Sequence, residues 1–389
     1  MQKWILLGAS ALTLSASPVP NTGAADLPAA TQKALSELKL DASILKGLEA
    51  ELNMPKAWVD GAAKEEGVII LGTWRDREFR RMTGAFNERY PSVKLNYTRA
   101  GASARGIKVI VALREGRVLA DVLTSIGDSY VQFKKMKAFA GLRELPGFRS
   151  LEANFVAPDG TWASHKLSFR CMGYNTNLVK KADLPKTWDD LVRNPNWRGG
   201  RLGLSNHPNA WLLALWAAKG EKWGKEFTHR LFTDLAPQQR KEGMMATTAL
   251  TVAAEFYANI PGPERRAQDY ADKGAPISYH CPDPVPMTLS HIVMLEKAQH
   301  KNGARLFINW LLSVEGQLLQ YATSDSVPAH KALQQPRFIP FADTIIGKRR
   351  IVRDEEMFGS DLHKAMAKTW NAYWTQPVGE RKGKKKKNR

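Results

Sequence analysis

The sequence predicts an α/β fold, and three observations lead to that prediction. Short apolar strands alternate with segments of helical periodicity along most of the chain, a pattern typical of parallel strand–helix–strand units. Several of these strands run into loops rich in Gly, Ser, Thr and Asn, which is where open α/β sheets bind ligands. The chain has 389 residues, 43% of them hydrophobic, and this length gives room for two domains of ordinary size.

The N-terminus has the pattern of a secretory signal peptide over residues 1–25. Lys3 precedes an apolar run, and small residues follow up to Ala25. A buried N-terminal helix is the alternative. No later run approaches the roughly 18 apolar residues that a membrane span needs. We therefore expect an exported protein that is cleaved near Ala25 and located in the periplasm.

The elements of the first half follow in order. Residues 26–66 show helical spacing and predict an N-terminal helical segment. Strands are expected at 68–71, 93–97 and 120–124, each followed by a helix. The first two helices carry apolar residues up to Tyr90 and Leu113, and the third stops at Gly141.

The second half begins with a strand at Ser168 that is expected to break at residues 173–176. Thr187 is expected to cap a helix whose first turn carries two aspartates. A strand at 201–204 then runs into small polar residues, and Trp211 opens an apolar helix. Prolines make 282–286 a stiff extended crossing, followed by a strand at 289–295, two helices within 302–321 and a final helix over 361–374.

The net charge of +19 is concentrated partly at the C-terminus. Residues 380–389 hold seven basic residues and one acidic residue, which is typical of a solvated tail, and 376–389 is the expected extent of that tail. The remaining charge fits attraction to anionic ligands or to a membrane surface. No basic stripe with interleaved aromatic residues suggests stacking on bases, so we expect no nucleic-acid partner.

Several segments together resemble a known family. They are Ala85–Pro91, Ala120–Val122, Gly173–Thr176, Lys186–Leu191, Gly274–Pro276 and Ala304–Gln317. In this order and spacing, over about residues 55–337, the chain resembles the type II periplasmic solute-binding proteins of ABC importers. The resemblance is to the group that takes ferric iron, thiamine and 2-aminoethylphosphonate.

This resemblance implies two Rossmann-like lobes joined by two hinge strands near 169–173 and 283–287. Lobe 1 would comprise 67–170 and 284–375, and lobe 2 would comprise 171–283. The family also implies a monomer without a cofactor that binds a small molecule and delivers it to an ABC permease in the inner membrane. Both cysteines, Cys171 and Cys281, would lie close to the hinge, where we hypothesise a disulfide; two unpaired thiols are the alternative.

The candidate binding residues lie in loops that follow strands or precede helices. Backbone amides at helix starts suit an anion, and a guanidinium matches a carboxylate or phosphonate. The candidates are Thr73, Trp74, Arg75, Gly101, Ala102, Ser103, Ser125, Asp128, Arg170, Tyr174, Ser205, Asn206, His207, Trp211, Thr247 and Tyr257. The competing interpretations are that Ser103 and His207 are helix caps, that Trp74 is a core residue, and that the arginines are solvated.

The ligand is expected to be a small organic anion, a carboxylate or a phosphonate. Ferric iron is the alternative, but its binders in this family use adjacent tyrosines, whereas here Phe256 precedes Tyr257. Tyr174, Tyr257 and His207 would have to converge instead. We expect no enzyme, because no zinc motif, nucleophile elbow or P-loop is present. A sensor subunit that binds the same ligand is a further alternative.

Overall fold

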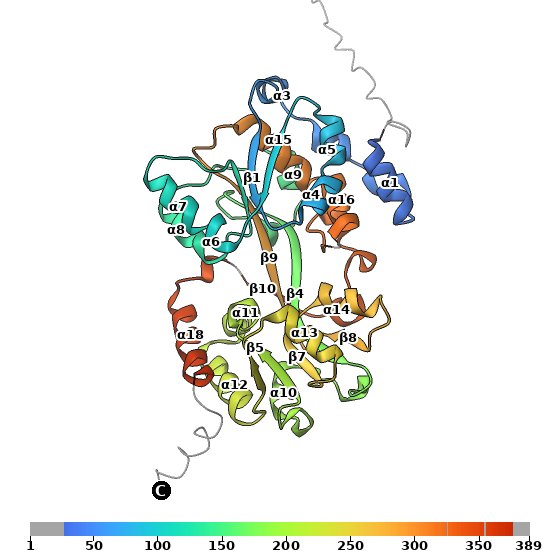
Figure 1. The fold of residues 1–389 in the computed structure, drawn as a ribbon, viewed down its shortest axis with the longest axis vertical. Coiled ribbons are helices and arrows are strands. Elements are labelled where there is room, and N and C mark those ends of the chain that lie inside the picture. Colours follow the sequence, from blue (N-terminus) through green and yellow to red (C-terminus); the bar gives the residue numbers. More distant parts are fainter. Residues whose placement is uncertain (1–26, 325, 354, 376–389) are drawn as a thin grey trace, which may run out of the picture.

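The computed structural model describes residues 27–324, 326–353 and 355–375. The expected signal peptide, 1–25, and the expected basic tail, 376–389, lie outside these residues. The described chain forms two α/β lobes, one above the other in Figure 1, with long strands passing between them. The predicted α/β class and two-lobed arrangement are confirmed.

Lobe 1 is built on a mixed sheet with the strand order β2–β1–β3–β9–β4. The first three strands are parallel, whereas β9 is antiparallel to β3 and to β4. The strands are β1 (Val68–Gly72), β2 (Leu95–Arg99), β3 (Val122–Thr124), β4 (Ala163–Asn175) and β9 (Val285–Met294). The main helices are α4 (Asp76–Met82), α5 (Gly84–Arg89), α6 (Ala102–Arg105), α7 (Ile107–Arg114), α8 (Tyr130–Lys135), α9 (Pro146–Arg149), α15 (Lys301–Leu312) and α16 (Val314–Ser324).

Lobe 2 shares β4 with lobe 1 and adds strands in the order β4–β7–β5–β6, with β8 pairing β4 on its other side. These strands are β5 (Leu202–Ser205), β6 (Gln238–Arg240), β7 (Ala258–Pro263) and β8 (Ile277–His280). The helices are α10 (Trp188–Arg193), α11 (Leu212–Lys219), α12 (Glu221–Thr233), α13 (Met244–Val252) and α14 (Glu264–Ala271). The predicted cap of α10 is confirmed, because Oγ1 of Thr187 accepts a hydrogen bond from the amide of Asp190 at 3.1 Å.

Three local expectations differ from the structure. The sheets are mixed rather than parallel, because strands that cross from one lobe to the other run back antiparallel to their neighbours. The strand expected to break at 173–176 continues through Tyr174 as β4, since β7 and β8 pair with it on both sides. The sequence also predicts a helix that follows the loop at residues 244–247 and ends at Tyr257, but α13 stops at Val252 and Tyr257 leads into β7.

Strands β4 and β9 form the two expected crossings between the lobes, and a further short strand lies beside them. Besides β4 and β9, the short strand β10 (Arg350–Arg353) pairs in parallel with the start of β9. The chain then continues to α18 (Asp361–Trp374), which packs beside α12 (Figure 1) and buries Met366 and Trp370 in the lobe 2 core. The C-terminal helix therefore lies on lobe 2, whereas we expected all of 284–375 to belong to lobe 1.

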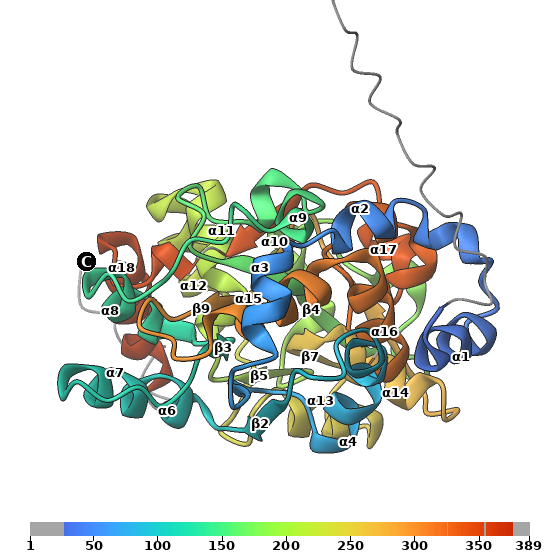
Figure 2. The ribbon, with the colours of Figure 1, turned by 90° about the horizontal axis from the view of Figure 1, so that it is seen from above.

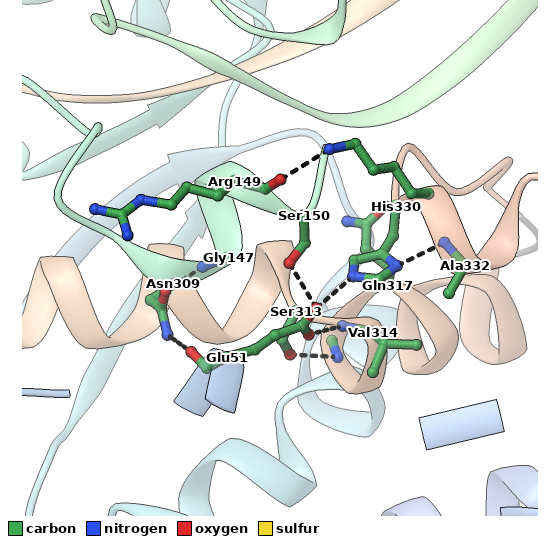
Figure 3. A network of polar contacts seen from close by, with 12 residues as sticks. Glu51, Gly147, Arg149, Ser150, Asn309, Ser313, Val314, Gln317, His330 and Ala332 are labelled. Atoms are coloured by element: carbon green, nitrogen blue, oxygen red, sulfur yellow. Dashed lines mark hydrogen bonds and ion pairs between the residues drawn. The ribbon is translucent and has the colours of Figure 1, made fainter. Parts of the chain in front are cut away.

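The N-terminal helical segment is fastened to lobe 1. It contains α1 (Ala29–Glu37), α2 (Leu48–Leu52) and α3 (Lys56–Ala62), and α1 lies against α16, as Figure 2 shows from above. The carboxylate of Glu51 accepts hydrogen bonds from Ser150 Oγ at 2.6 Å and from the Val314 amide at 2.8 Å (Figure 3). It also lies 2.7 Å from Nε2 of His330. The Ala332 amide donates to His330 Nδ1 at 3.1 Å, which leaves Nε2 to carry the proton toward Glu51.

A disulfide joins Cys171 on β4 to Cys281 after β8, so of the two alternatives the structure has the bridged one. Both residues are fully buried. Next to the bridge, the hydroxyl of Tyr279 donates to the Gly262 carbonyl at 2.7 Å and accepts from the Cys171 amide at 2.8 Å. The bridge thus ties together the points where the chain enters and leaves lobe 2, close to both hinge strands.

Candidate functional site

A cleft of about 550 Å³ opens between the two lobes, beside the hinge strand β4. Lobe 1 contributes the loop after β1, the first turn of α4 and the end of β2. Lobe 2 contributes the start of α13 and the first turns of α14, and the residues after α16 complete the wall. A hollow of about 1000 Å³ between α4, α5 and β2 is larger, but its described lining comes from lobe 1 alone, so lobe closure does not enclose it.

Four predicted residues meet in this cleft: Thr73, Trp74, Arg75 and Arg170. The hydroxyl of Thr73 is buried and has no hydrogen-bond partner within the described part of the chain, which is unusual for a buried polar group. Trp74 serves mainly as core, because it is 2% exposed and its indole donates to Gln320 at 3.1 Å. Arg75 is exposed, and its side chain lies 3.7 Å from the carboxylate of Glu78.

Arg170 is largely occupied by a carboxylate of the protein. Its Nη1 donates to Glu264 at 3.0 Å, and the two side chains are only 18% and 3% exposed. Burial raises the pKa of Glu264 above its usual value, against the opposing effect of the neighbouring Arg170 charge. The buried pair holds α14 against β4 and fixes the floor of the cleft.

Four of the lobe 2 candidates lie in the core of that lobe rather than in the cleft. They are Tyr174, Ser205, Trp211 and Thr247, each buried. Trp211 packs against Trp188 with ring centroids 5.0 Å apart, and the Thr247 hydroxyl donates to the Met244 carbonyl at 3.0 Å. These side chains shape the lobe and do not line the cleft.

The remaining lobe 2 candidates lie at its surface. Asn206 accepts a hydrogen bond from the Trp370 indole at 2.8 Å, which anchors α18. His207 lies beside Gly243 at the start of α13, and its pKa is below the usual value because of desolvation and the charge of nearby Arg170. Tyr257 lies under the guanidinium of Arg201, 5.0 Å away, in a separate pocket of lobe 2. Tyr174, Tyr257 and His207 therefore do not converge as a ferric ion would require.

The other lobe 1 candidates lie outside the lining of the cleft. Gly101, Ala102 and Ser103 are exposed at the start of α6, and Asp128 is exposed after β3. Ser125 has a left-handed backbone conformation with φ 53°, and its carbonyl accepts from Arg105 at 2.9 Å. Its hydrogen bond holds the loop after β3 against the α6 segment.

Sequence reasoning missed the residues that give the cleft most of its charge. They are Glu78, Arg99, Lys166, Glu264, Arg265, Arg266 and Asp269. Two signals were present in the sequence. Lys166, Ser168 and Arg170 alternate along a strand, which places them on one face, and a run of charged residues follows the strand that ends at Pro263.

Two lobes joined by crossing strands, with a charged cleft between them, define a bilobal binding protein. A family model described as "Bacterial extracellular solute-binding protein" matches residues 81–344. The chain belongs to this family, and its fold is that of the type II periplasmic solute-binding proteins of ABC importers. The family consists of substrate-binding components of transporters.

Solved structures show the same fold at low sequence identity. Iron-bound HitA from Pseudomonas aeruginosa is 18% identical with a TM-score of 0.63, over 79% of this chain and 99% of that one. AfuA from Actinobacillus pleuropneumoniae, with fructose-6-phosphate bound, is 17% identical with a TM-score of 0.62, over 80% and 100%. A putative extracellular solute-binding protein from Bordetella parapertussis is 14% identical with a TM-score of 0.66, over 79% and 99%. No curated protein matches the sequence.

Two further observations concern the described residues. None of their helices combines the length and the apolar character needed to cross a membrane. No group of three or more His, Cys, Asp or Glu side chains among them is arranged to hold a metal ion.

Proposed function

We propose that this protein captures a small organic anion, a carboxylate or a phosphonate, in the cleft between its lobes. It then delivers the solute in the periplasm to an ABC permease of the inner membrane. The protein acts as a receptor and performs no covalent chemistry on the solute.

The charge of the cleft is the observation that carries this proposal. Its described lining holds three carboxylates, and each is paired with an arginine: Arg75–Glu78 at 3.7 Å, Arg170–Glu264 at 3.0 Å and Arg265–Asp269 at 2.9 Å. Three further cations line the cleft, and none of them forms an ion pair with a carboxylate of the described residues: Arg99, Lys166 and Arg266. A lining with this surplus of positive charge favours an anionic solute over a cationic or neutral one.

Closure of the lobes supplies the mechanism. The moving parts in this proposal are 67–170 with 284–350, and 171–283 with α18, hinged on β4, β9 and β10. A solute that contacts both lobes stabilises the closed form, and its difference in affinity for the two forms drives the closure. Each described carboxylate of the lining is paired with an arginine, so these carboxylates offer little repulsion to an incoming anion.

Thermal unfolding of protein stripped of ligand tests this proposal. The panel contains mono- and dicarboxylates, phosphonates, phosphate esters, ferric citrate and thiamine. A binder at a hundred times its dissociation constant adds about 2.7 kcal/mol and raises the melting temperature by several degrees. We expect the shift with organic anions, weakened by Arg99→Gln at the cleft and unchanged by Arg114→Gln on the exposed side of α7. Stabilisation by thiamine alone, or by ferric citrate but not by citrate, contradicts the proposal.

A further inference from the structure

The hinge strand β4 presents one polar face to the cleft. Lys166, Ser168 and Arg170 alternate along it, and all three line the cleft. The pairing of β4 with β9 is regular from Lys166 onward but shifts between Ser164 and Lys166, so His165 is an extra residue in the ladder. Such a bulge changes the direction of the side chain that follows it and is common beside binding sites. Here it precedes the lysine that faces the cleft.

Lys166 has an unusual environment for a lysine. Its side chain is half-buried, and its ammonium makes no hydrogen bond or ion pair with the described residues. The charged groups that act on it are Arg170 on the same strand, Glu78 on α4, Glu264 on α14 and Arg105 on α6. Burial, together with Arg170, lowers the pKa of Lys166 to about 8. An ammonium that is partly withdrawn from water without a partner costs free energy, and an incoming anion would offset that cost.

The partners of the other cations in the cleft distinguish Lys166 further. Arg75, Arg170 and Arg265 each have a carboxylate of the protein beside them. Arg99 is exposed at the end of β2 in lobe 1. In lobe 2, Arg266 donates to the hydroxyl of Tyr270 at 2.8 Å and leaves its Nε buried without a partner.

We propose that Lys166 is the principal anion-binding residue of the cleft and that the solute carries two or more negative charges, one held by Lys166 and the others contacted by Arg99 and Arg266. The inference rests on the proposed function and narrows its solute to a dianion. Lys166 holds one negative charge of the solute at the hinge strand, and Arg99 and Arg266 approach the solute from opposite lobes. A dianion therefore gains more from closure than a monoanion, because only the dianion satisfies Lys166 and the closing cations together.

The test is isothermal titration calorimetry of the full mature protein with matched probes. Succinate and its monomethyl ester differ by one charge at nearly constant shape, and glycerol 3-phosphate and its methyl phosphodiester form the corresponding phosphate pair. We expect a dianion to bind at least on the order of tenfold more tightly than its matched probe. Whether succinate or glycerol 3-phosphate binds more tightly distinguishes a dicarboxylate from a phosphate ester.

Three variants assign the effect to Lys166. Lys166→Met is expected to weaken dianion binding by on the order of 10- to 100-fold, the loss of one charge-assisted hydrogen bond. Lys166→Arg is expected to restore most of it. Lys108→Met, which removes the same charge from the exposed part of α7, is expected to leave binding unchanged.

Each failure has a separate meaning. Equal affinity for succinate and its monomethyl ester, or full affinity in Lys166→Met, overturns the inference and leaves a receptor for anions standing. Binding of thiamine but of none of the anions overturns the inference and the proposed function together.

Discussion

Removing the Cys171–Cys281 bridge is predicted to destabilise the protein strongly. The bond closes a loop with a sequence separation of 110 residues that contains nearly all of lobe 2. In the chain-entropy account, the unfolded state gains the freedom of that loop when the bond is absent, which for this length costs about 5 kcal/mol at 25 °C. The loss is a large part of the stability of an ordinary domain.

Urea unfolding of a Cys171→Ala/Cys281→Ala variant measures this loss. Wild-type protein refolded under reducing conditions is the matched control, because it keeps both sulfur atoms and lacks only the bond. We expect both to lose comparable free energy relative to the oxidised protein. A loss below about 1 kcal/mol in both would show that the bridge does not constrain the unfolded chain as the loop length requires.

Three other predictions concern stability. Burial raises the pKa of Glu51, but His330 and the other hydrogen-bond donors lower it by more, so that the net pKa is below the ordinary value of 4.5. The stability that this carboxylate contributes should therefore be present above pH 4.5 and lost as the pH falls below it, and acid titrations of the wild type and Glu51→Gln will compare this loss. A Cβ at Gly262 would lie 2.5 Å from the Gly173 amide nitrogen, so Gly262→Ala should cost about 2 kcal/mol in urea unfolding, and an unchanged midpoint would refute that close approach of β7 to β4. Lys166→Met should raise the melting temperature of ligand-free protein, because it removes a desolvated ammonium. The pKa of Lys166 falls to about 8 on folding, so the unfavourable contribution of this lysine to the free energy of unfolding should diminish as the pH rises from 8 toward 10.5.

The sequence predicts the bounds of a helix or strand well where the chemistry of nearby side chains determines where it begins and ends. The final helix is predicted over 361–374, and α18 has these bounds. Ser360 caps its start, because the Ser360 hydroxyl accepts a hydrogen bond from the His363 amide at 3.2 Å. Its position on lobe 2 could not be predicted, because an apolar stripe shows that a helix face is buried but not against which partner. The short strand β10 was missed for the same reason: a four-residue strand is stable only because β9 lies beside it.

The candidate site was only partly predictable. The loop after β1 is recognisable because ligands bind at the carboxyl ends of strands, and Thr73 and Arg75 do line the cleft. Trp211 and Thr247 follow similar loops but are turned into the lobe 2 core. In the sequence, Lys166 looks like any surface lysine; the bulge at His165 and the partners of the neighbouring arginines exist only in three dimensions.

The central claim is that an anionic solute binds between the lobes and closes them. Small-angle X-ray scattering of ligand-stripped protein, with and without the tightest anionic binder of the thermal-unfolding panel, tests it most directly. The account predicts a smaller radius of gyration with the binder, and no such contraction in Lys166→Met at the same concentration. An unchanged radius of gyration at a saturating concentration of the binder would contradict it.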